Sequence, residues 1–89
     1  MMADMIDDVT VKEVWVSAHA VTGLTAGAAL MLQNKGPFNV LMFIGAQAPT
    51  ADSFKGYRIG EDREWVTDAG DTVWLRAENG SSTMCIQEA

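Results

Sequence analysis

The sequence has very few of the residues that build catalytic or metal-binding sites. Its 89 residues include one cysteine, Cys85, and one histidine, His19. A single cysteine excludes an internal disulfide, and a zinc site needs about four Cys or His ligands. Cys85 and His19 would form a nucleophilic pair if they met in space, but no local nucleophile signature accompanies the cysteine. We therefore expect a protein that is not an enzyme, with no metal and no cofactor.

Both residues have more ordinary interpretations. Cys85 lies within the alternating run 83–87, where cysteine often serves as a small apolar core residue. His19 comes at the end of another alternating run and is expected at the surface or in a loop.

Basic residues are also scarce and scattered. Six Lys and Arg stand against twelve Asp and Glu, which gives a net charge of −6 and a pI of about 4.4. Nucleic acids and anionic membranes are bound by clustered basic side chains. We therefore expect neither partner. The six basic residues are Lys12, Lys35, Lys55, Arg58, Arg63 and Arg76.

Long apolar runs are missing as well. The longest, 40–44, has five residues, whereas a membrane helix needs about 20. The first eight residues carry acids and no basic residue, so they do not resemble a signal peptide. We expect synthesis in a cytosol, because a single unpaired thiol fits a reducing compartment. Virions are also assembled in the cytosol, so the expectation is compatible with a virion protein.

The acidic residues are grouped near predicted turns. Asp62, Asp68 and Asp71 fall in neighbouring turns, and such turns could converge on a calcium ion. The spacing of an EF-hand is absent, and aspartate is itself a common turn residue. Together with Glu64, these acids are better interpreted as a solvated edge than as a pair of catalytic carboxylates.

Short alternating runs dominate the rest of the chain. Turn residues recur about every ten positions between them, which is typical of an antiparallel β-sandwich or small barrel. We predict an all-β fold of about seven short strands. Apolar residues on both faces of 39–45 indicate a central strand that is covered on both sides. The expected strands are 14–19, 28–33, 39–45, 57–59, 65–67, 72–78 and 83–87.

Helix is disfavoured in the alanine-rich stretch 18–32. Gly23, Gly27 and three β-branched residues all lower helix propensity there. Two tight connections are predicted to be hairpin turns, 60–62 and 79–82.

The chain reads as one domain with a short extension. Residues 1–10 are predicted to be a flexible acidic arm, and 11–89 a single sandwich domain. Met5 and Ile6 would let the arm dock on a neighbouring molecule. A domain this small, without disulfides or metal, is often stabilised by a partner.

Three tryptophans are many for a chain of this size. Trp74, between Val73 and Leu75, is expected in the core. Trp15 and Trp65 have apolar neighbours in alternating runs, so at least one is expected to be partly exposed, where it could contact a protein or a sugar. The predicted contact residues are therefore Met5, Ile6, Trp15 and Trp65.

The order of features resembles the small β-sandwich structural proteins of tailed bacteriophages, which decorate capsids or belong to heads and tails. The resemblance covers about residues 25–88. It rests on Leu32-Gln33-Asn34, the strand 40–44, Ala48-Pro49, the Gly60-Glu61 turn and Val73-Trp74-Leu75-Arg76-Ala77.

The resemblance implies a non-enzymatic virion protein, a capsid decoration protein above all. It would bind the major capsid protein or another virion protein, as a homo-oligomer, commonly a trimer, and stabilise the assembled head. Two alternatives remain: a tail or fibre-associated component, and a small module that binds carbohydrate or a host surface.

Overall fold

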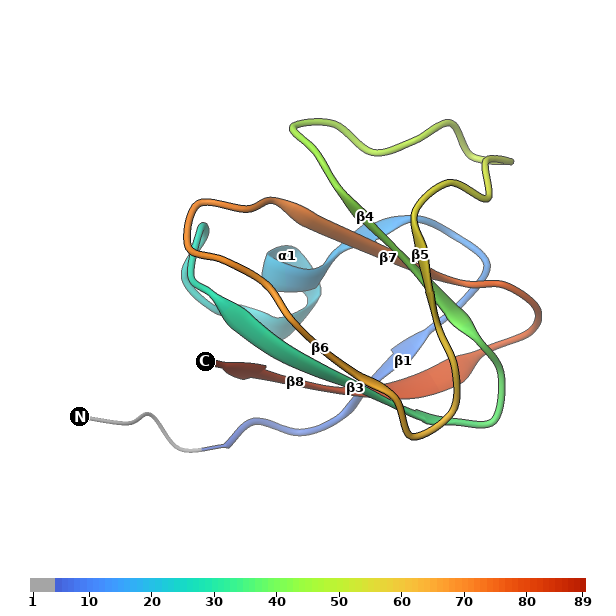
Figure 1. Cartoon of the computed structure of the whole chain (residues 1–89), viewed down its shortest axis with the longest axis horizontal. Helices are drawn as coiled ribbons and strands as arrows, with labels where there is room; N and C mark the ends of the chain where they lie inside the picture. The colour runs from blue at the N-terminus through green and yellow to red at the C-terminus, as the bar shows by residue number, and fades with distance from the viewer. Residues whose placement is uncertain (1–4) are drawn as a thin grey trace.

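The computed structural model describes residues 5–89, which form two antiparallel four-stranded sheets packed against each other (Figure 1). Sheet A has the strand order β1-β8-β3-β6, and sheet B has the order β2-β7-β4-β5. The predicted all-β sandwich is confirmed, with eight strands in place of about seven. The elements are β1 (Val9–Val11), β2 (Val16–Ser17), α1 (Ala18–Thr22), β3 (Leu30–Gly36), β4 (Val40–Ile44), β5 (Tyr57–Ile59), β6 (Glu64–Val66), β7 (Val73–Ala77) and β8 (Ser82–Glu88).

Alternation along the strands decides which side chains enter the core, because successive residues of a strand point to opposite faces. In the seven-residue strand β8, Met84 and Ile86 are buried, while Cys85 between them is only half-buried on the outer face. The expectation that Cys85 is a core residue is therefore wrong. The core contains Val11, Ala18, Leu30, Leu32, Val40, Met42, Ile59, Val73, Leu75, Met84 and Ile86.

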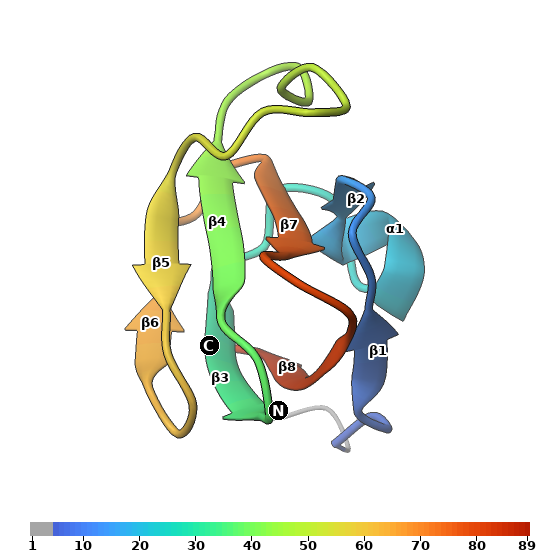
Figure 2. The same cartoon turned by 90° about the vertical axis from the view of Figure 1, so that its right-hand side faces the viewer.

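Most connections carry the chain from one sheet to the other (Figure 2). Strands β5 and β6 flank the predicted hairpin at 60–62, yet β5 belongs to sheet B and β6 to sheet A. The same holds for β7 and β8 around the predicted hairpin at 79–82. Both hairpin predictions are wrong, because alternation shows which face of a strand is apolar and not which sheet the strand joins.

Asn34 ties the two sheets together near these crossings. Its side chain is fully buried in β3, and its amide nitrogen donates to the carbonyl oxygens of Phe38 and Ile59 at 2.7 and 2.8 Å. Its amide oxygen accepts from the Gly36 N–H and the Ser82 hydroxyl at 2.8 and 2.7 Å. One side chain thus satisfies groups from β5, β8 and the turn that follows β3.

Of the strand predicted at 14–19, only β2 forms, and its last two residues instead begin the helix α1. Ser17 caps its start, since the serine hydroxyl accepts from the Ala20 N–H. Gly23 ends it in the left-handed conformation at φ 74°, and its N–H donates to the His19 carbonyl. The two caps outweigh the low helix propensity of this stretch.

The N-terminal residues join sheet A earlier than expected. Strand β1 begins at Val9, so residues 9 and 10 of the predicted arm pair with β8. The first four residues of that arm lie outside the described part of the chain. Within residues 5–89, no helix has the length and apolar character needed to span a membrane.

Candidate docking surface on sheet A

The two sheets differ in how their outer faces are finished. On sheet B, the segment 45–56 between β4 and β5 folds back over the outer face (Figure 1). Arg76 of β7 holds this loop: it is only 4% exposed, its Nη1 donates to the Ala51 carbonyl at 3.0 Å, and its guanidinium lies 4.7 Å from the Phe54 ring centre. Its Nε donates to the Ala77 carbonyl. The outer face of sheet B is therefore closed by the chain itself.

Trp15 belongs to this closed face. It is buried, its indole N–H donates to the Ser53 carbonyl at 3.2 Å, and its ring meets Phe43 edge to face. Trp15 was predicted as a partner contact, but in this structure its ring lies beneath the protein's own loop. It is not part of the exposed surface described below.

Trp74 also lies on the outer face of sheet B. Strand β7 turns Val73, Leu75 and Ala77 inward, so the alternation places Trp74 outward, half-buried, with its indole N–H donating to the Gly45 carbonyl at 2.9 Å. The prediction that Trp74 is a core residue is wrong, because its apolar neighbours occupy the inward positions.

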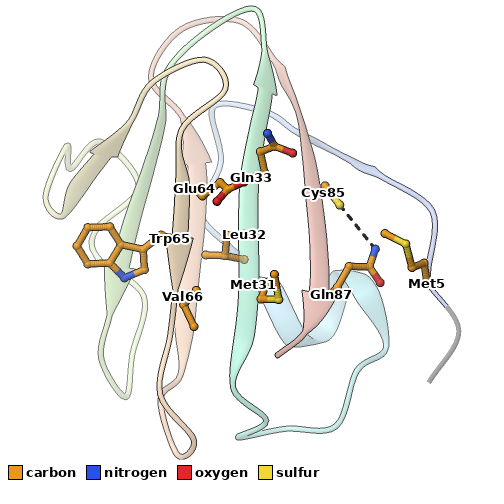
Figure 3. Close-up of a pocket in the computed structure, with 9 residues that line it drawn as sticks. All are labelled: Met5, Met31, Leu32, Gln33, Glu64, Trp65, Val66, Cys85 and Gln87. Carbon is orange, nitrogen blue, oxygen red and sulfur yellow. Dashed lines mark hydrogen bonds between the residues drawn. The ribbon is translucent and has the colours of Figure 1, made fainter. Parts of the chain in front are cut away.

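The outer face of sheet A has no such cover. Met31 of β3 and Val66 of β6 are cross-strand partners there and remain 52% and 61% exposed. They border a shallow, largely apolar hollow of about 130 Å³, which Cys85 and Gln87 of β8 border from the other side (Figure 3). Exposed apolar side chains gathered in one place on a small protein commonly mark an interaction site.

The segment before β1 reaches the rim of this hollow. Met5 borders it and is 76% exposed (Figure 3). Ile6 is held by the Gln87 side chain, whose amide nitrogen donates to the Ile6 carbonyl at 2.9 Å and whose amide oxygen accepts from the Ile6 N–H at 3.0 Å. The structure therefore places Met5 and Ile6, two of the predicted contact residues, beside the open face of sheet A.

Trp65, the fourth predicted contact residue, lies at the margin of this face. It packs partly against the core from the free edge strand β6, and its ring stacks on Tyr57 with 4.5 Å between ring centres. Figure 3 shows its ring turned away from Met31. Tyr57 is the more exposed member of the pair, at 56%. A second hollow beside the stack is lined by Arg58, Ile59, Gly60, Arg63, Glu64 and Trp65.

The structure gives Cys85 and His19 separate environments. His19 is buried in α1, with Nε2 2.9 Å from the Ala28 carbonyl, and the expectation that it is a surface or loop residue is wrong. The Cys85 sulfur lies 3.8 Å from the Gln87 amide nitrogen on the outer face of sheet A. In this structure, His19 contacts Ala28 and Cys85 contacts Gln87.

The acidic turn residues also have local roles. The Asp71 carboxylate accepts from the Asp68 N–H at 3.1 Å, and Asp62 adopts a positive φ of 65° in the crossing from β5 to β6. Within residues 5–89, no three His, Cys, Asp or Glu side chains gather closely enough to hold a metal ion.

Two ion pairs shift pKa values at the surface. The hydrogen bonds from Arg58 and Asn39 lower the pKa of the Glu78 carboxyl, while the bond to Glu78 raises the pKa of Arg58. On the outer face of sheet A, a 2.7 Å hydrogen bond to Asp8 raises the pKa of Lys35. Asp8 thus fixes the segment before β1 at a second point, two residues beyond Ile6.

Two important side chains were missed by the sequence analysis. Arg76 was counted among the scattered basic residues and as part of the 73–77 motif, but no structural role was predicted for it, although a lone arginine within an apolar run is a recognisable signal of a buried, bonded charge. Gln87 was taken as a strand end. Gln87 hydrogen-bonds to Ile6, which lies 81 positions earlier in the sequence, and no local sequence pattern reveals a contact over that separation.

Comparisons of the chain with protein-family models, with curated proteins and with solved structures found no match.

Proposed function

We propose that this chain is a non-enzymatic structural protein of a tailed-phage virion, most specifically a decoration protein that binds the major capsid protein of the assembled head as a homo-oligomer such as a trimer. The resemblance of residues 25–88 to such proteins is the reason for naming the virion. In this proposal, the protein joins a virion that is assembled in the host cytoplasm, and it acts there. Binding at many equivalent sites would stabilise the shell, because a ligand that binds only the assembled state raises the cost of disassembly.

The open face of sheet A is the observation that carries this proposal. The chain closes the outer face of sheet B with its own loop but leaves Met31 and Val66 exposed on sheet A. The core of an interface buries apolar and methionine-rich surface, while its rim stays polar. On sheet A, the flanking polar side chains of Gln33 and Glu64 supply such a rim. The proposed partner surface is therefore apolar, and it meets β3 and β6.

The proposal is tested by co-sedimentation of the purified protein with purified heads of the phage that encodes it. A charge at Val66 should abolish binding, because it would bury an unpaired carboxylate in the interface. Val66→Glu is therefore compared with Val14→Glu, whose valine is 64% exposed but lies between β1 and β2. Bound protein is measured by gel densitometry of washed particles. Equal occupancy by the two variants, or no binding of the wild type, contradicts the proposal.

A second candidate is a carbohydrate-binding module, alone or on a phage tail or fibre. The stack of Tyr57 on Trp65, next to Arg58, Arg63 and Glu64, favours it, because an exposed aromatic ring beside charged side chains suits a sugar ring with its hydroxyl groups. Tryptophan fluorescence should then change on titration with a glycan, and Tyr57→Ala should remove the response. A flat titration across a glycan panel contradicts this candidate.

A further inference from the structure

The crossing from β7 to β8 carries an asparagine followed by a glycine, Asn79 and Gly80, and both residues are exposed. In such a pair, the main-chain nitrogen of the glycine can attack the side-chain carbonyl carbon of the asparagine. Glycine favours the attack because it has no side chain to obstruct the approach and its backbone adopts many conformations. Gly80 already has a positive φ of 61°. The crossing therefore holds the groups needed for a reaction of the chain with itself.

The other two asparagines lack this combination. Asn34 is fully buried, and its side chain makes four hydrogen bonds. The Asn39 side chain donates to the Glu78 carboxylate at 3.1 Å. Lysine follows Asn34 and valine follows Asn39, so a side chain stands beside the nitrogen that would attack. Reaction is therefore expected at Asn79 before the other two.

A carboxylate holds the attacking nitrogen of this pair. Glu13, in the connection between β1 and β2, accepts from the Gly80 N–H through Oε2 at 2.9 Å. The nitrogen attacks as its anion, after it has lost the proton. A negative carboxylate that accepts this N–H stabilises the protonated form and repels the anion. Glu13 therefore slows the attack while the hydrogen bond is in place.

Arg76 lies beside the other oxygen of the same carboxylate. Its Nη2 is 3.9 Å from Glu13 Oε1, and the arginine side chain is buried whereas that of Glu13 is 54% exposed. Arg76 is itself fixed by its bond to the Ala51 carbonyl. A buried cation thus gives an exposed glutamate a stationary partner. The contacts run from the loop over sheet B, through Arg76 and Glu13, to the Gly80 nitrogen.

We propose that Asn79 is a site of slow self-modification, in which the Gly80 nitrogen attacks the Asn79 side chain and Glu13 restrains the reaction. The new bond joins the Gly80 nitrogen to Cγ of Asn79. The side-chain nitrogen takes up the proton from the Gly80 nitrogen and leaves as ammonia. Water then opens the succinimide ring at either carbonyl, which leaves aspartate or isoaspartate. Water is the only other reactant, and the reaction does not depend on the virion role.

The product changes the crossing in two ways. A carboxylate replaces the amide next to Glu78 and close to Glu13, and these like charges repel one another. Isoaspartate also adds a methylene group to the main chain between β7 and β8. We therefore expect the modified protein to lose part of the contact between Glu13 and Gly80.

Peptide mapping of the purified full-length protein tests the proposal. The folded protein is incubated in mildly alkaline buffer, and the peptides that contain the three asparagines are followed by mass spectrometry, with aspartate and isoaspartate separated by chromatography. We expect Asn79 to react about tenfold faster than Asn34 or Asn39, because only the Gly80 nitrogen is approached without obstruction. Isoaspartate should be among its products, since it forms only through the ring. Equal rates at the three positions, or aspartate without isoaspartate, overturn the proposal.

Variants of Glu13 test the restraint. Glu13→Ala removes both the acceptor and the charge, and we expect the rate at Asn79 to rise about fivefold because a charge-assisted hydrogen bond is lost. Glu13→Gln keeps an acceptor oxygen and should raise the rate less. Val14→Ala, at an exposed position in the same connection, is the matched control and should react as the wild type does. Urea denaturation shows that each variant is folded during the incubation. A rate in folded Glu13→Ala equal to that of the control overturns the role of Glu13.

Discussion

The outer face of sheet B is covered by the chain's own loop, whereas the outer face of sheet A is exposed to solvent. On sheet B, a buried arginine and a returning loop cover Trp15 and Phe43, so this face behaves as a second layer of the core. On sheet A, Met31 and Val66 are left to solvent beside a lightly held N-terminal segment. Two sheets of equal size thus differ in their outer faces: the covered face of sheet B contributes stability, and the exposed face of sheet A is the surface that we propose for binding.

The largest loss of folding stability is expected on removing the side chain of Asn34, which ties the two sheets together. Asn34→Ala removes four hydrogen bonds and leaves the buried Ser82 hydroxyl and two carbonyls without their partner. Unsatisfied buried groups cost about 1–3 kcal/mol each, so we expect a loss of about 3 kcal/mol or more. Urea denaturation measures it, with exposed Asn79→Ala as the control. If both variants unfold at the same urea concentration, Asn34 is not the tie between the sheets.

Substitution of Arg76 on the covered face of sheet B should reduce the free energy of unfolding by nearly as much. Arg76→Met keeps the apolar stem but loses the bonds to Ala51 and Ala77 and the contact with Phe54, for which we expect a loss of about 2 kcal/mol. The loop 45–56 should also become easier to cut by a protease. Lys55→Met, an exposed basic residue of the same loop, is the matched control. Unchanged cleavage in Arg76→Met would show that the loop is held by other contacts.

A smaller, pH-dependent contribution is expected from Glu78, where the bonds from Arg58 and Asn39 lower the carboxyl pKa. A lowered native pKa means that the folded state favours the ionised form. This stabilisation is complete above the ordinary carboxyl pKa of about 4.3 and is lost as the pH falls through the native value. Glu78→Gln should therefore reduce the urea midpoint at pH 7 more than at pH 3. An equal reduction at both pH values would contradict the assignment.

The smallest effect on stability belongs to the open face. Val66→Glu should change the free energy of unfolding by less than about 0.5 kcal/mol, because Val66 is already mostly exposed. Val14→Glu should behave alike, so any difference between the two in particle binding would come from the surface and not from folding. A large loss of stability in Val66→Glu alone would mean that the open face is part of the core after all.

Alternation and the spacing of turns were enough to predict the sheet character of the chain and most strand positions. Alternation in β3, β7 and β8 places apolar side chains on one face whatever the partner strand. The run at 39–45 correctly indicated a central strand, since β4 lies between β7 and β5 and Val40–Met42 are buried. Charge and composition are properties of the chain alone and needed no structure.

Which sheet each strand joins, and which outer face is covered, could not be predicted from local patterns. The crossings at 60–62 and 79–82 look like hairpins locally, and the closure over Trp15 depends on a contact between residues 51 and 76. The short helix α1 is set by caps at Ser17 and Gly23 that act against propensity. Local patterns report the preference of a strand for burial on one face. Pairing and covering are instead settled by contacts between residues far apart in the chain, and these form only when the two sheets pack together.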